Sequence, residues 1–410
     1  MAEGLTRLSN VIEGVELEEV REGRARILVP KMDKYLRHDG VYEPSWAPIF
    51  YNPLMVFNRD VSILVLNAYR SMRGVKEPLV VEPLSGTGVR AVRYALEANA
   101  RVVANDIDHL SVKVIARNIE LNNVAARVNV YNLDASELLA MLRRTGIKPE
   151  MIDIDPFGTP VPYIDVAVQS LGKRGIIAIT ATDTAPLAGV YPLTLKRRYG
   201  VRPARTAWEK EQAVRVLAGY IIRRSAAYDY GARVLLAYYA DHYVRVFVEL
   251  TRGAKRANDS LKQLSYAAYC RNCHHTLYTR SSELERCPLC YSRLDIIGPL
   301  YSGPLCDREF IGRMRSMLAR HEYLQTTTRI KTLLNHLANE CSITRPYYRI
   351  DLLCSKLKLN MPSPARIVER LAEKGYPSSL THFDKRAVKT TAPYHVLLEV
   401  LRELSPKPPR

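Results

Sequence analysis

Short apolar runs alternate with segments of helical periodicity between residues 78 and 182. The runs 79–81 and 175–182 are apolar almost throughout, which is typical of strands covered on both faces. Between the runs, apolar residues recur three and four positions apart, as on one face of a helix. This alternation predicts a parallel sheet with helices on both faces. The expected strands are 79–81, 101–105, 128–132, 151–154 and 175–182, and the expected helices are 89–99, 111–121 and 136–144.

Other elements precede and follow this region. Residues 24–30 predict a strand, and residues 51–70 predict a helix that begins after Asn52-Pro53. A long helix is expected at 206–227, and two alternating runs around Asp241-His242 predict an antiparallel hairpin at the sheet edge. The hairpin strands are 234–240 and 243–250. The expected fold class is therefore α/β and Rossmann-like, with a mostly parallel sheet and an antiparallel edge hairpin.

The polar segment 252–262 marks the expected end of this domain, which would span residues 1–252 with its N-terminal extension. Residues 253–410 are expected to form a mixed α+β domain, and a chain of 410 residues fits two domains. Within the second domain we expect a Cys-pair module at 268–292, helix-rich stretches at 307–341 and 364–375, a closing helix at 394–404, and a winged-helix-like segment spanning 364–405.

The composition and net charge of the chain indicate what kind of partner it binds. Hydrophobic residues make up 47% of the chain, enough for packed cores, and the formal net charge is +18. Such an excess of positive charge suits a polyanion, of which nucleic acid is the usual one, although a basic surface can also serve solubility alone. An anionic membrane fits less well, because no basic helix with a clean apolar face is evident. We expect no membrane association and infer no obligatory protein partner.

The cysteine content argues against a secreted disulfide scaffold, since seven cysteines in 410 residues are too few. The first twenty residues lack the basic start and apolar run of a signal peptide, and no apolar stretch is long enough to span a bilayer. We therefore expect a cytoplasmic protein.

Polar turns follow three successive strands of the expected sheet. Gly86-Thr-Gly88 lies between a strand and a helix, and glycine lets a ligand approach the backbone closely. Asp106 and Asp108 close the next strand, where a carboxylate can accept the ribose hydroxyls, and Asp134 closes the third. These carboxylates could instead merely cap helices. Their coherent placement at the carboxyl ends of parallel strands favours a nucleotide-like ligand.

Two ligands fit such a crevice, a nicotinamide dinucleotide and S-adenosylmethionine. The full G-x-G-x-x-G pattern is absent, because Ala91 stands where its third glycine or alanine would be and the first glycine is displaced. Only one mononucleotide-binding half is evident. Both features favour S-adenosylmethionine, which has no pyrophosphate to hold at the helix N-terminus.

The segment Asp153-Ile-Asp155-Pro-Phe-Gly158 follows the fourth strand and carries the candidate chemistry. An exocyclic aryl amine is a poor nucleophile, so a carboxylate that accepts its N–H hydrogen bond helps the nitrogen to attack a methyl group. Asp155 offers that carboxylate, the Pro156 carbonyl can hold the second N–H, and Phe157 can stack on an extruded base. A Pro-Phe-Gly turn with Asp155 as a cap is the alternative.

These residues resemble the archaeal-type tRNA guanine-26 N2-dimethyltransferases, which are class I methyltransferases. The resemblance extends from about residue 15 to 405. Its segments are Phe50-Tyr-Asn-Pro53, Asn58-Arg-Asp60, Leu84-Ser-Gly-Thr-Gly-Val-Arg90, Asp155-Pro-Phe-Gly158, Ala181-Thr-Asp-Thr-Ala-Pro186, Ala240-Asp-His-Tyr243, Thr381-His-Phe383 and Lys389-Thr-Thr-Ala-Pro393. One departure is Glu82, at a strand end where aspartate is expected; it keeps the charge and lengthens the reach.

The resemblance implies a set of site residues and a reaction. Those implied to line the S-adenosylmethionine site are Phe50, Arg59, Arg90, Asp106, Asp134 and Ala135. Those implied to handle the target amine are Asp155, Pro156 and Phe157. The implied reaction is dimethylation of N2 of a tRNA guanine by direct methyl transfer after the base is extruded.

Four cysteines form two close pairs, Cys270-x-x-Cys273 and Cys287-x-x-Cys290, with zinc-ribbon spacing. Four thiolates suit tetrahedral Zn²⁺ and leave no open position, so the expected zinc is structural. A redox pair, two disulfides or an iron–sulfur cluster are weaker alternatives. The scattered Cys306, Cys341 and Cys354 are expected to be buried apolar residues and not nucleophiles.

The C-terminal region interleaves basic and aromatic side chains, a composition that supports phosphate contacts with tRNA. The basic residues are Arg313, Arg315, Arg320, Arg329, Lys331, Arg345, Lys356, Lys358, Lys385, Arg386 and Lys389, and the aromatic ones are Tyr323, Tyr347, Tyr348, Tyr376 and Phe383. Three rival functions remain open at this point: methylation of another exocyclic amine, such as a different tRNA guanine or adenine N6, non-catalytic RNA binding, and nicotinamide-dependent oxidoreduction.

Overall fold

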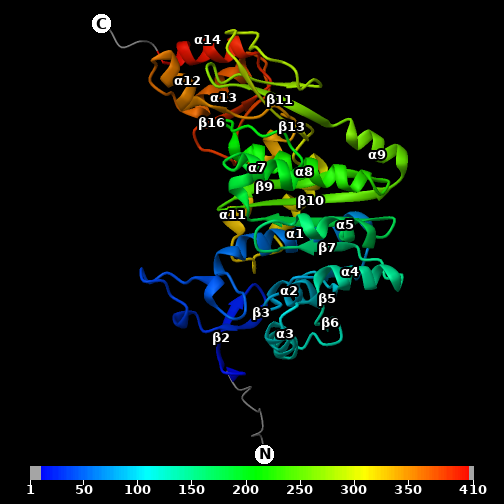
Figure 1. The fold of residues 1–410 in the computed structure, drawn as a ribbon. Helices are drawn as coiled ribbons and strands as arrows, with labels where there is room; N and C mark the ends of the chain where they lie inside the picture. The colour runs from blue at the N-terminus through cyan, green and yellow to red at the C-terminus, as the bar shows by residue number, and fades with distance from the viewer. Residues whose placement is uncertain (1–10, 406–410) are drawn as a thin grey trace, which may run out of the picture. The chain divides into compact units, whose positions relative to one another are not determined.

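A computed structural model describes residues 11–405 (Figure 1). The chain forms two compact units. Unit 1 contains the chain up to Ile154, together with residues 170–172 and 317–330. Unit 2 contains residues 155–169, 173–316 and the chain from Lys331 onward. These units do not follow the expected boundary at 252/253, which concerned functional domains and stays a prediction. The outer ends of both expected domains, residues 1–10 and 406–410, lie outside the described residues.

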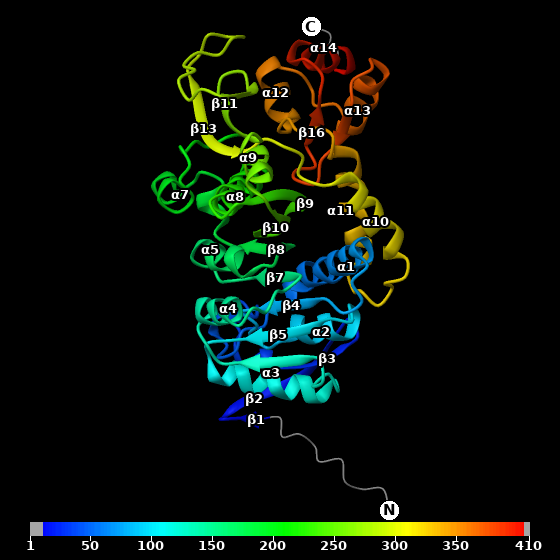
Figure 2. The same ribbon diagram turned by 90° about the vertical axis from the view of Figure 1, so that its right-hand side faces the viewer.

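Unit 1 holds four parallel strands in the order β6-β5-β4-β7 and a separate antiparallel sheet in the order β1-β2-β3. Figure 2 shows β5, β4 and β7 one above the other. The strands are β1 (Val11–Ile12), β2 (Val15–Glu22), β3 (Ala25–Pro30), β4 (Leu79–Glu82), β5 (Arg101–Asn105), β6 (Val128–Tyr131) and β7 (Met151–Ile154). The α-helices are α1 (Val56–Arg73), α2 (Val89–Glu97), α3 (His109–Leu121) and α4 (Ala135–Arg144), and short 3₁₀ turns cover Met32–Lys34, Pro44–Trp46 and Pro53–Met55.

The parallel strands form because their apolar side chains are removed from water on both faces. Val80, Val81 and Ala104 are fully or almost fully buried, and β4 pairs with β5 from Leu79 opposite Arg101 onward. The antiparallel sheet packs on α3, where Leu28 and Val114 share a buried cluster. This pairing and burial fix the positions of the strand ends, and the residues of the candidate site lie at those ends.

Residues 317–330 join unit 1 although they lie far along the chain. Thr326 donates from its backbone N and its hydroxyl to Asp60 Oδ2, at 2.9 and 2.6 Å, and Gln325 Nε2 donates to the Arg21 carbonyl at 3.0 Å. The Arg329 guanidinium lies 4.0 Å from the Phe57 ring centroid. These contacts attach the start of α11 to α1 and β2.

Unit 2 contains the antiparallel strands β8-β10-β9, which belong to a seven-stranded sheet, and two three-stranded antiparallel sheets in the orders β12-β11-β13 and β14-β16-β15. The strands are β8 (Arg174–Ala181), β9 (Tyr230–Ala240), β10 (Tyr243–Arg252), β11 (Leu264–Cys270), β12 (Thr276–Thr279), β13 (Leu294–Tyr301), β14 (Tyr348–Arg349), β15 (Ser378–Leu380) and β16 (Ala387–Thr390). The helices that begin in unit 2 are α5 (Val161–Ser170), α6 (Thr184–Leu187), α7 (Pro192–Tyr199), α8 (Glu209–Ala226), α9 (Ala254–Leu261), α10 (Arg308–Leu318), α12 (Ile350–Leu357), α13 (Pro364–Glu373) and α14 (Tyr394–Leu404), whereas α11 (Thr327–Glu340) begins in unit 1 and ends in unit 2.

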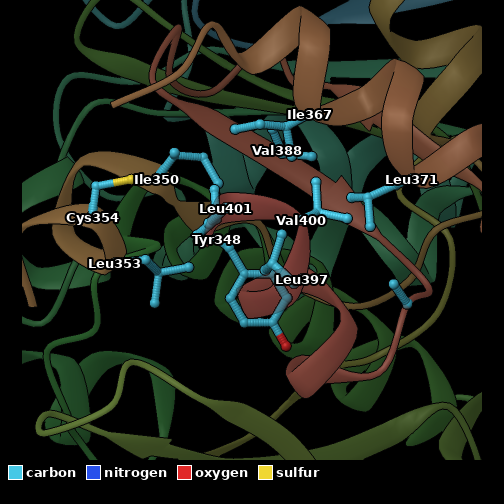
Figure 3. Packing of buried hydrophobic residues seen from close by; sticks show 11 residues of the cluster. Tyr348, Ile350, Leu353, Cys354, Ile367, Leu371, Val388, Leu397, Val400 and Leu401 are labelled. Atoms are coloured by element: carbon cyan, nitrogen blue, oxygen red, sulfur yellow. The ribbon is translucent and has the colours of Figure 1, made fainter. Parts of the chain in front are cut away.

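The C-terminal part of unit 2 has its own apolar core. Figure 3 shows Ile367 and Leu371 of α13, Val388 of β16 and Leu397 and Leu401 of α14 gathered around it, and all five are fully buried. The helices expected at 364–375 and 394–404 are present as α13 and α14, with the short strands β15 and β16 between them, and the winged-helix-like assignment of 364–405 stays a prediction.

Most expected elements are confirmed within a few residues, and the α/β fold class with its parallel strands and its antiparallel hairpin is correct. The segment 252–262 differs, because it contains the helix α9 and not only an irregular linker. Its buried residues, Ala257 and Ser260, are both small, so the buried face of this helix is weakly marked in the sequence. None of the helices within 11–405 has the length and apolar character that a bilayer crossing requires.

The expectation for two scattered cysteines is wrong in part. Cys306 and Cys341 are buried, as expected, but they form a disulfide with Cα atoms 5.4 Å apart. Residues 35 positions apart are brought together by packing, which spacing alone does not reveal. Cys354 is buried and free, as expected.

Candidate active site

The turn after β4 is built around two glycines with left-handed backbone. Gly86 has φ +55°, and a Cβ at that position would lie 2.9 Å from the Phe50 carbonyl oxygen. Gly88 has φ +72°, and its Cβ would lie 3.0 Å from Ile115. Glycine is therefore required twice, by conformation and by close approach. This tight cradle is what a small ligand needs to reach the backbone at the N-terminus of α2.

Asp106, at the end of β5, turns its carboxylate toward the glycine turn. Oδ2 accepts a hydrogen bond from Gly86 N at 2.8 Å, and Oδ1 accepts one from Asp108 N at 3.0 Å. Burial raises the pKa of Asp106. The ends of β4 and β5 are thus joined at the residue expected to bind the ribose. Ile107 beside it exposes a large apolar side chain, which offers a face for a base.

Asn105 is a positioning residue that reasoning from the sequence did not single out. Its Nδ2 donates to the carbonyls of Pro83, at 3.0 Å, and Leu133, at 2.9 Å, and its Oδ1 accepts from Leu133 N at 3.0 Å. The turns after β4, β5 and β6 are therefore tied together by one buried amide. A polar side chain as the last residue of a buried strand is the signal that could have identified it.

The two remaining acidic strand-end residues do cap helices. Asp108 accepts from Ser111 N at 2.9 Å at the start of α3. Asp134 Oδ1 accepts from Ser136 N, at 2.8 Å, and Glu137 N, at 3.3 Å, at the start of α4. Asp134 is exposed and Ala135 is buried. Both residues therefore cap helices, and a cap that uses Oδ1 leaves Oδ2 of Asp134 for another donor.

Arg90 lies buried behind the glycine turn. Its Nε is 3.3 Å from Glu82 Oε1, and its Nη1 donates to Asn58 Oδ1 at 3.0 Å and to Ser62 Oγ at 2.9 Å. Asp153 of β7 accepts from the Tyr94 hydroxyl at 2.6 Å and lies 3.6 Å from Arg90. The longer reach of Glu82 thus serves the ion pair with Arg90.

Arg59 is held by a carboxylate that was not anticipated. Its Nε and Nη2 both lie 2.6 Å from the carboxylate oxygens of Glu22 in β2, and Arg93 lies 2.8 Å from Glu22 Oε1. Burial alone would raise the pKa of Glu22, but Arg59 and Arg93 lower it to about 2. Arg59 therefore belongs to a buried ion-pair cluster, and one edge of its guanidinium is already occupied.

The candidate catalytic loop, residues 155–158, follows β7 and belongs to unit 2. Pro156 is buried, Asp155 is half-buried, and the Phe157 side chain is 67% exposed. Gly158 N donates to Thr182 Oγ1 at 2.7 Å, and the Gly158 carbonyl accepts from Thr182 N, at 3.0 Å, and Asp183 N. The loop is therefore fastened to the end of β8, and the aromatic ring is presented to solvent.

The four paired cysteines come together in the β11–β13 module. Their sulfur atoms lie within 4.8 Å of one another, with Cys270 Sγ 3.5 Å from Cys290 Sγ and Cys273 Sγ 3.6 Å from Cys287 Sγ. Tetrahedral Zn²⁺ with Zn–S bonds of ~2.3 Å requires sulfur atoms about 3.8 Å apart. His274 and Tyr291, which follow the second cysteine of each pair, both have φ near +60°. Two matching knuckles thus form a site that fits zinc.

Parallel strands that end in a glycine turn and acidic side chains define this chain as a Rossmann-like protein of the class I methyltransferase type. A family model described as N2,N2-dimethylguanosine tRNA methyltransferase matches residues 23–402. The chain therefore belongs to the N2,N2-dimethylguanosine tRNA methyltransferase family.

Individual relatives agree over almost the full length. The tRNA (guanine(26)-N(2))-dimethyltransferase of Metallosphaera sedula is 37% identical over 391 residues, which cover 95% of this chain and 97% of that protein. The protein of the same name from Saccharolobus solfataricus is 36% identical over 393 residues, covering 95% and 100%. A solved structure of Trm1 from Pyrococcus horikoshii, in complex with S-adenosyl-L-methionine, superposes with a TM-score of 0.82 at 33% identity, covering 94% and 100%.

Proposed function

We propose that this chain transfers methyl groups from S-adenosylmethionine to N2 of a guanine in tRNA, in the cytoplasm. The observation that carries the proposal is the cradle at the ends of β4, β5 and β6 in a member of this family. Relatives named for dimethylation of guanine 26 support that position and a dimethylated product. The resemblance found in the sequence points to the same reaction.

The cofactor would be held by residues of unit 1. Asp106 accepts the ribose hydroxyls, and Asp134 and Ala135 meet the adenine, with the exposed Ile107 against its face. Arg90, Arg59 and Phe50 enclose the methionine end of the ligand. The cradle fits this role, because side chains are excluded at Gly86 and Gly88. S-adenosylmethionine supplies an electrophilic methyl group on a sulfonium when bound.

Asp155, Pro156 and Phe157 would act on the target base. The Asp155 carboxylate accepts a hydrogen bond from the exocyclic N2 and takes its proton as the nitrogen bonds to carbon. The Pro156 carbonyl holds the second N–H, and the exposed Phe157 ring stacks on the guanine after it is extruded from the tRNA. Most of the rate enhancement would come from positioning, because the weakly nucleophilic amine is held in a productive orientation toward the methyl group.

The second unit would bind tRNA and keep its shape with zinc. Exposed basic side chains of unit 2, such as Arg315, Lys331, Arg345 and Lys385, contact phosphates, and the net charge of +18 draws the polyanion toward the protein. The expectation for Lys389 is wrong, because its ammonium group is buried 2.8 Å from Glu211 Oε1. Cys270, Cys273, Cys287 and Cys290 hold structural Zn²⁺. The metal has no part in the methyl transfer step.

The test compares Asp155→Asn with the matched control Asp259→Asn in methyl transfer from radiolabelled S-adenosylmethionine to a tRNA transcript. Asp259 is a surface carboxylate paired with Lys262 on α9, so its loss leaves turnover unchanged. Loss of the general base at Asp155 should lower kcat about 10²- to 10⁴-fold. Equal rates for the two variants would reject the role of Asp155.

A further inference from the structure

The segment between β8 and α8 contains α6 and α7, and its two ends are clamped together. The Tyr199 hydroxyl lies 2.8 and 2.9 Å from the two carboxylate oxygens of Asp183 and 3.0 Å from Thr159 Oγ1. Arg198 adds an ion pair to Asp183 at 3.0 Å. Because Thr159 follows Gly158 directly, the base of this segment is fastened to the candidate catalytic loop.

The inner side of the segment is fixed as well. Leu187 and Leu195 are fully buried, and Gln212 of α8 donates to the Leu187 carbonyl at 3.2 Å. Arg223 of α8 donates to the Tyr199 carbonyl at 2.5 Å. At Gly189, with φ +83°, a Cβ would lie 2.3 Å from the Ala204 carbonyl oxygen. The segment is therefore a rigid projection, which costs little conformational entropy when a ligand binds.

The outer side of the segment exposes several large apolar side chains close together. Val190, Tyr191 and Leu193 are 43%, 58% and 76% exposed, within four consecutive positions. Single exposed apolar residues are normal, whereas a contiguous group indicates a binding surface. The same helix continues into Lys196, Arg197 and Arg198 without any acidic residue, and the first two are exposed.

The exposed apolar side chains and the neighbouring cations indicate which class of partner this surface binds. Tyrosine and arginine occur at protein–protein as well as nucleic-acid interfaces, whereas lysine is depleted from the former. The three consecutive cations of α7, without an acidic residue in the helix, therefore favour a polyanion over a protein partner. A ring that can stack on bases beside cations that can hold phosphates suits RNA. Through Thr159, the segment is also fastened to the loop that presents Phe157, where the proposed substrate would lie.

We propose that residues 190–197 form a contact surface for the substrate tRNA beside the target guanine. Tyr191 stacks on a neighbouring unpaired base, Leu193 packs against it, and Lys196 and Arg197 hold the adjoining phosphates. This inference rests on the proposed function, since it names a further contact for the same substrate.

The first experiment measures KM for tRNA and kcat with the double variant Tyr191→Ala/Leu193→Ala. Loss of base stacking should raise KM about 5- to 100-fold while kcat at saturating tRNA changes less than about 2-fold. S-adenosylmethionine affinity, measured by calorimetry, should not change. Tyr191→Phe should recover most of the lost tRNA affinity because the ring remains. Leu261→Ala, which truncates a leucine 39% exposed on α9, is the matched control.

The second experiment measures tRNA affinity against salt for Lys196→Ala/Arg197→Ala. Each lost phosphate contact lowers the slope of log affinity against log salt by about 0.7–0.9, so the double variant should lower it by about 1.5. Variants that match the Leu261→Ala control in both KM and salt slope overturn the inference. If the wild-type protein transfers no methyl group to tRNA, the proposed function fails, and direct tRNA affinities of the same variants still decide the inference.

Discussion

Single residues decide whether the cofactor turn can form. Gly86 and Gly88 are needed for positive φ and for the close approach of Phe50 and Ile115, and Asn105 joins three turns through one amide. A side chain added at Gly86 or Gly88 should therefore affect ligand binding more than the stability of the rest of the fold. The effect of backbone conformation can be separated from the effect of crowding, because Gly146 has a similar positive φ but open space around its Cβ.

Gly86→Ala should lower S-adenosylmethionine affinity at least tenfold, since its Cβ meets the Phe50 carbonyl and displaces the turn that Asp106 holds. Gly146→Ala is the control: its φ is +77°, and a Cβ there meets nothing within 4 Å. Both variants should lose about 1 kcal/mol of stability from the strained backbone. Calorimetry of cofactor binding distinguishes them, and equal affinities for the two variants would count against a ligand at this turn.

Glu22 holds the buried guanidinium groups of Arg59 and Arg93, and its removal leaves two buried charges undercompensated. Glu22→Gln should lower the free energy of unfolding at pH 7 by about 3 kcal/mol. Glu19→Gln, on the exposed side of the same strand, should cost less than about 1 kcal/mol. Urea unfolding of both variants measures the difference.

The pH dependence of this difference has a definite sign. Because the pKa of Glu22 falls from its ordinary 4.5 to about 2 in the folded state, its stabilisation is complete above pH 4.5. It is lost as the pH falls from 4.5 toward 2, so wild type and Glu22→Gln should converge over that window. A difference that stays constant down to the acid limit would mean that Glu22 is not paired as described.

At the scale of elements, the proposed zinc would stabilise the β11–β13 module, and a disulfide holds the end of α11. The module is a small three-stranded sheet with a core of few residues, among them three of the four clustered cysteines. A sheet of this size is marginal without a metal or another cross-link. The Cys306–Cys341 disulfide links the chain after β13 to the end of α11.

Cys287→Ser should remove one zinc ion per chain and lower the melting temperature, because structural zinc contributes directly to folding. It should also weaken tRNA binding, while cofactor affinity stays close to that of wild type, since the proposed cofactor residues lie in unit 1. Elemental analysis, calorimetry and tRNA titration test the three parts. A metal-free wild-type protein that melts at the same temperature as the zinc-loaded wild type would contradict the structural role of zinc.

Replacing both Cys306 and Cys341 by serine should lower stability by about 3–4 kcal/mol, the entropy of closing a loop of this length. The melting temperature of the wild type should fall when a phosphine reductant is added, and that of the double variant should not respond. Cys354→Ala, at a buried free thiol, should keep the wild-type response to the reductant.

At the scale of the whole molecule, local patterns predicted more than long-range pairing did. The strands of unit 1, the glycine turn and the four clustered cysteines follow from periodicity and spacing, because each depends on neighbours in the chain. The ion pair of Glu22 with Arg59, the disulfide and the docking of residues 317–330 on α1 join distant positions, so no local pattern contains them. Helix α9 was not predicted because the side chains that it buries, Ala257 and Ser260, are small.

The methylated nucleoside that forms in tRNA is identified most directly by nucleoside mass spectrometry. An unmodified tRNA transcript is incubated with the protein and S-adenosylmethionine, digested and mapped. We predict N2,N2-dimethylguanosine at one guanine, position 26, with N2-methylguanosine as its precursor. Methylation of another atom or another base, or no methylation by a protein that binds both S-adenosylmethionine and tRNA, would contradict it.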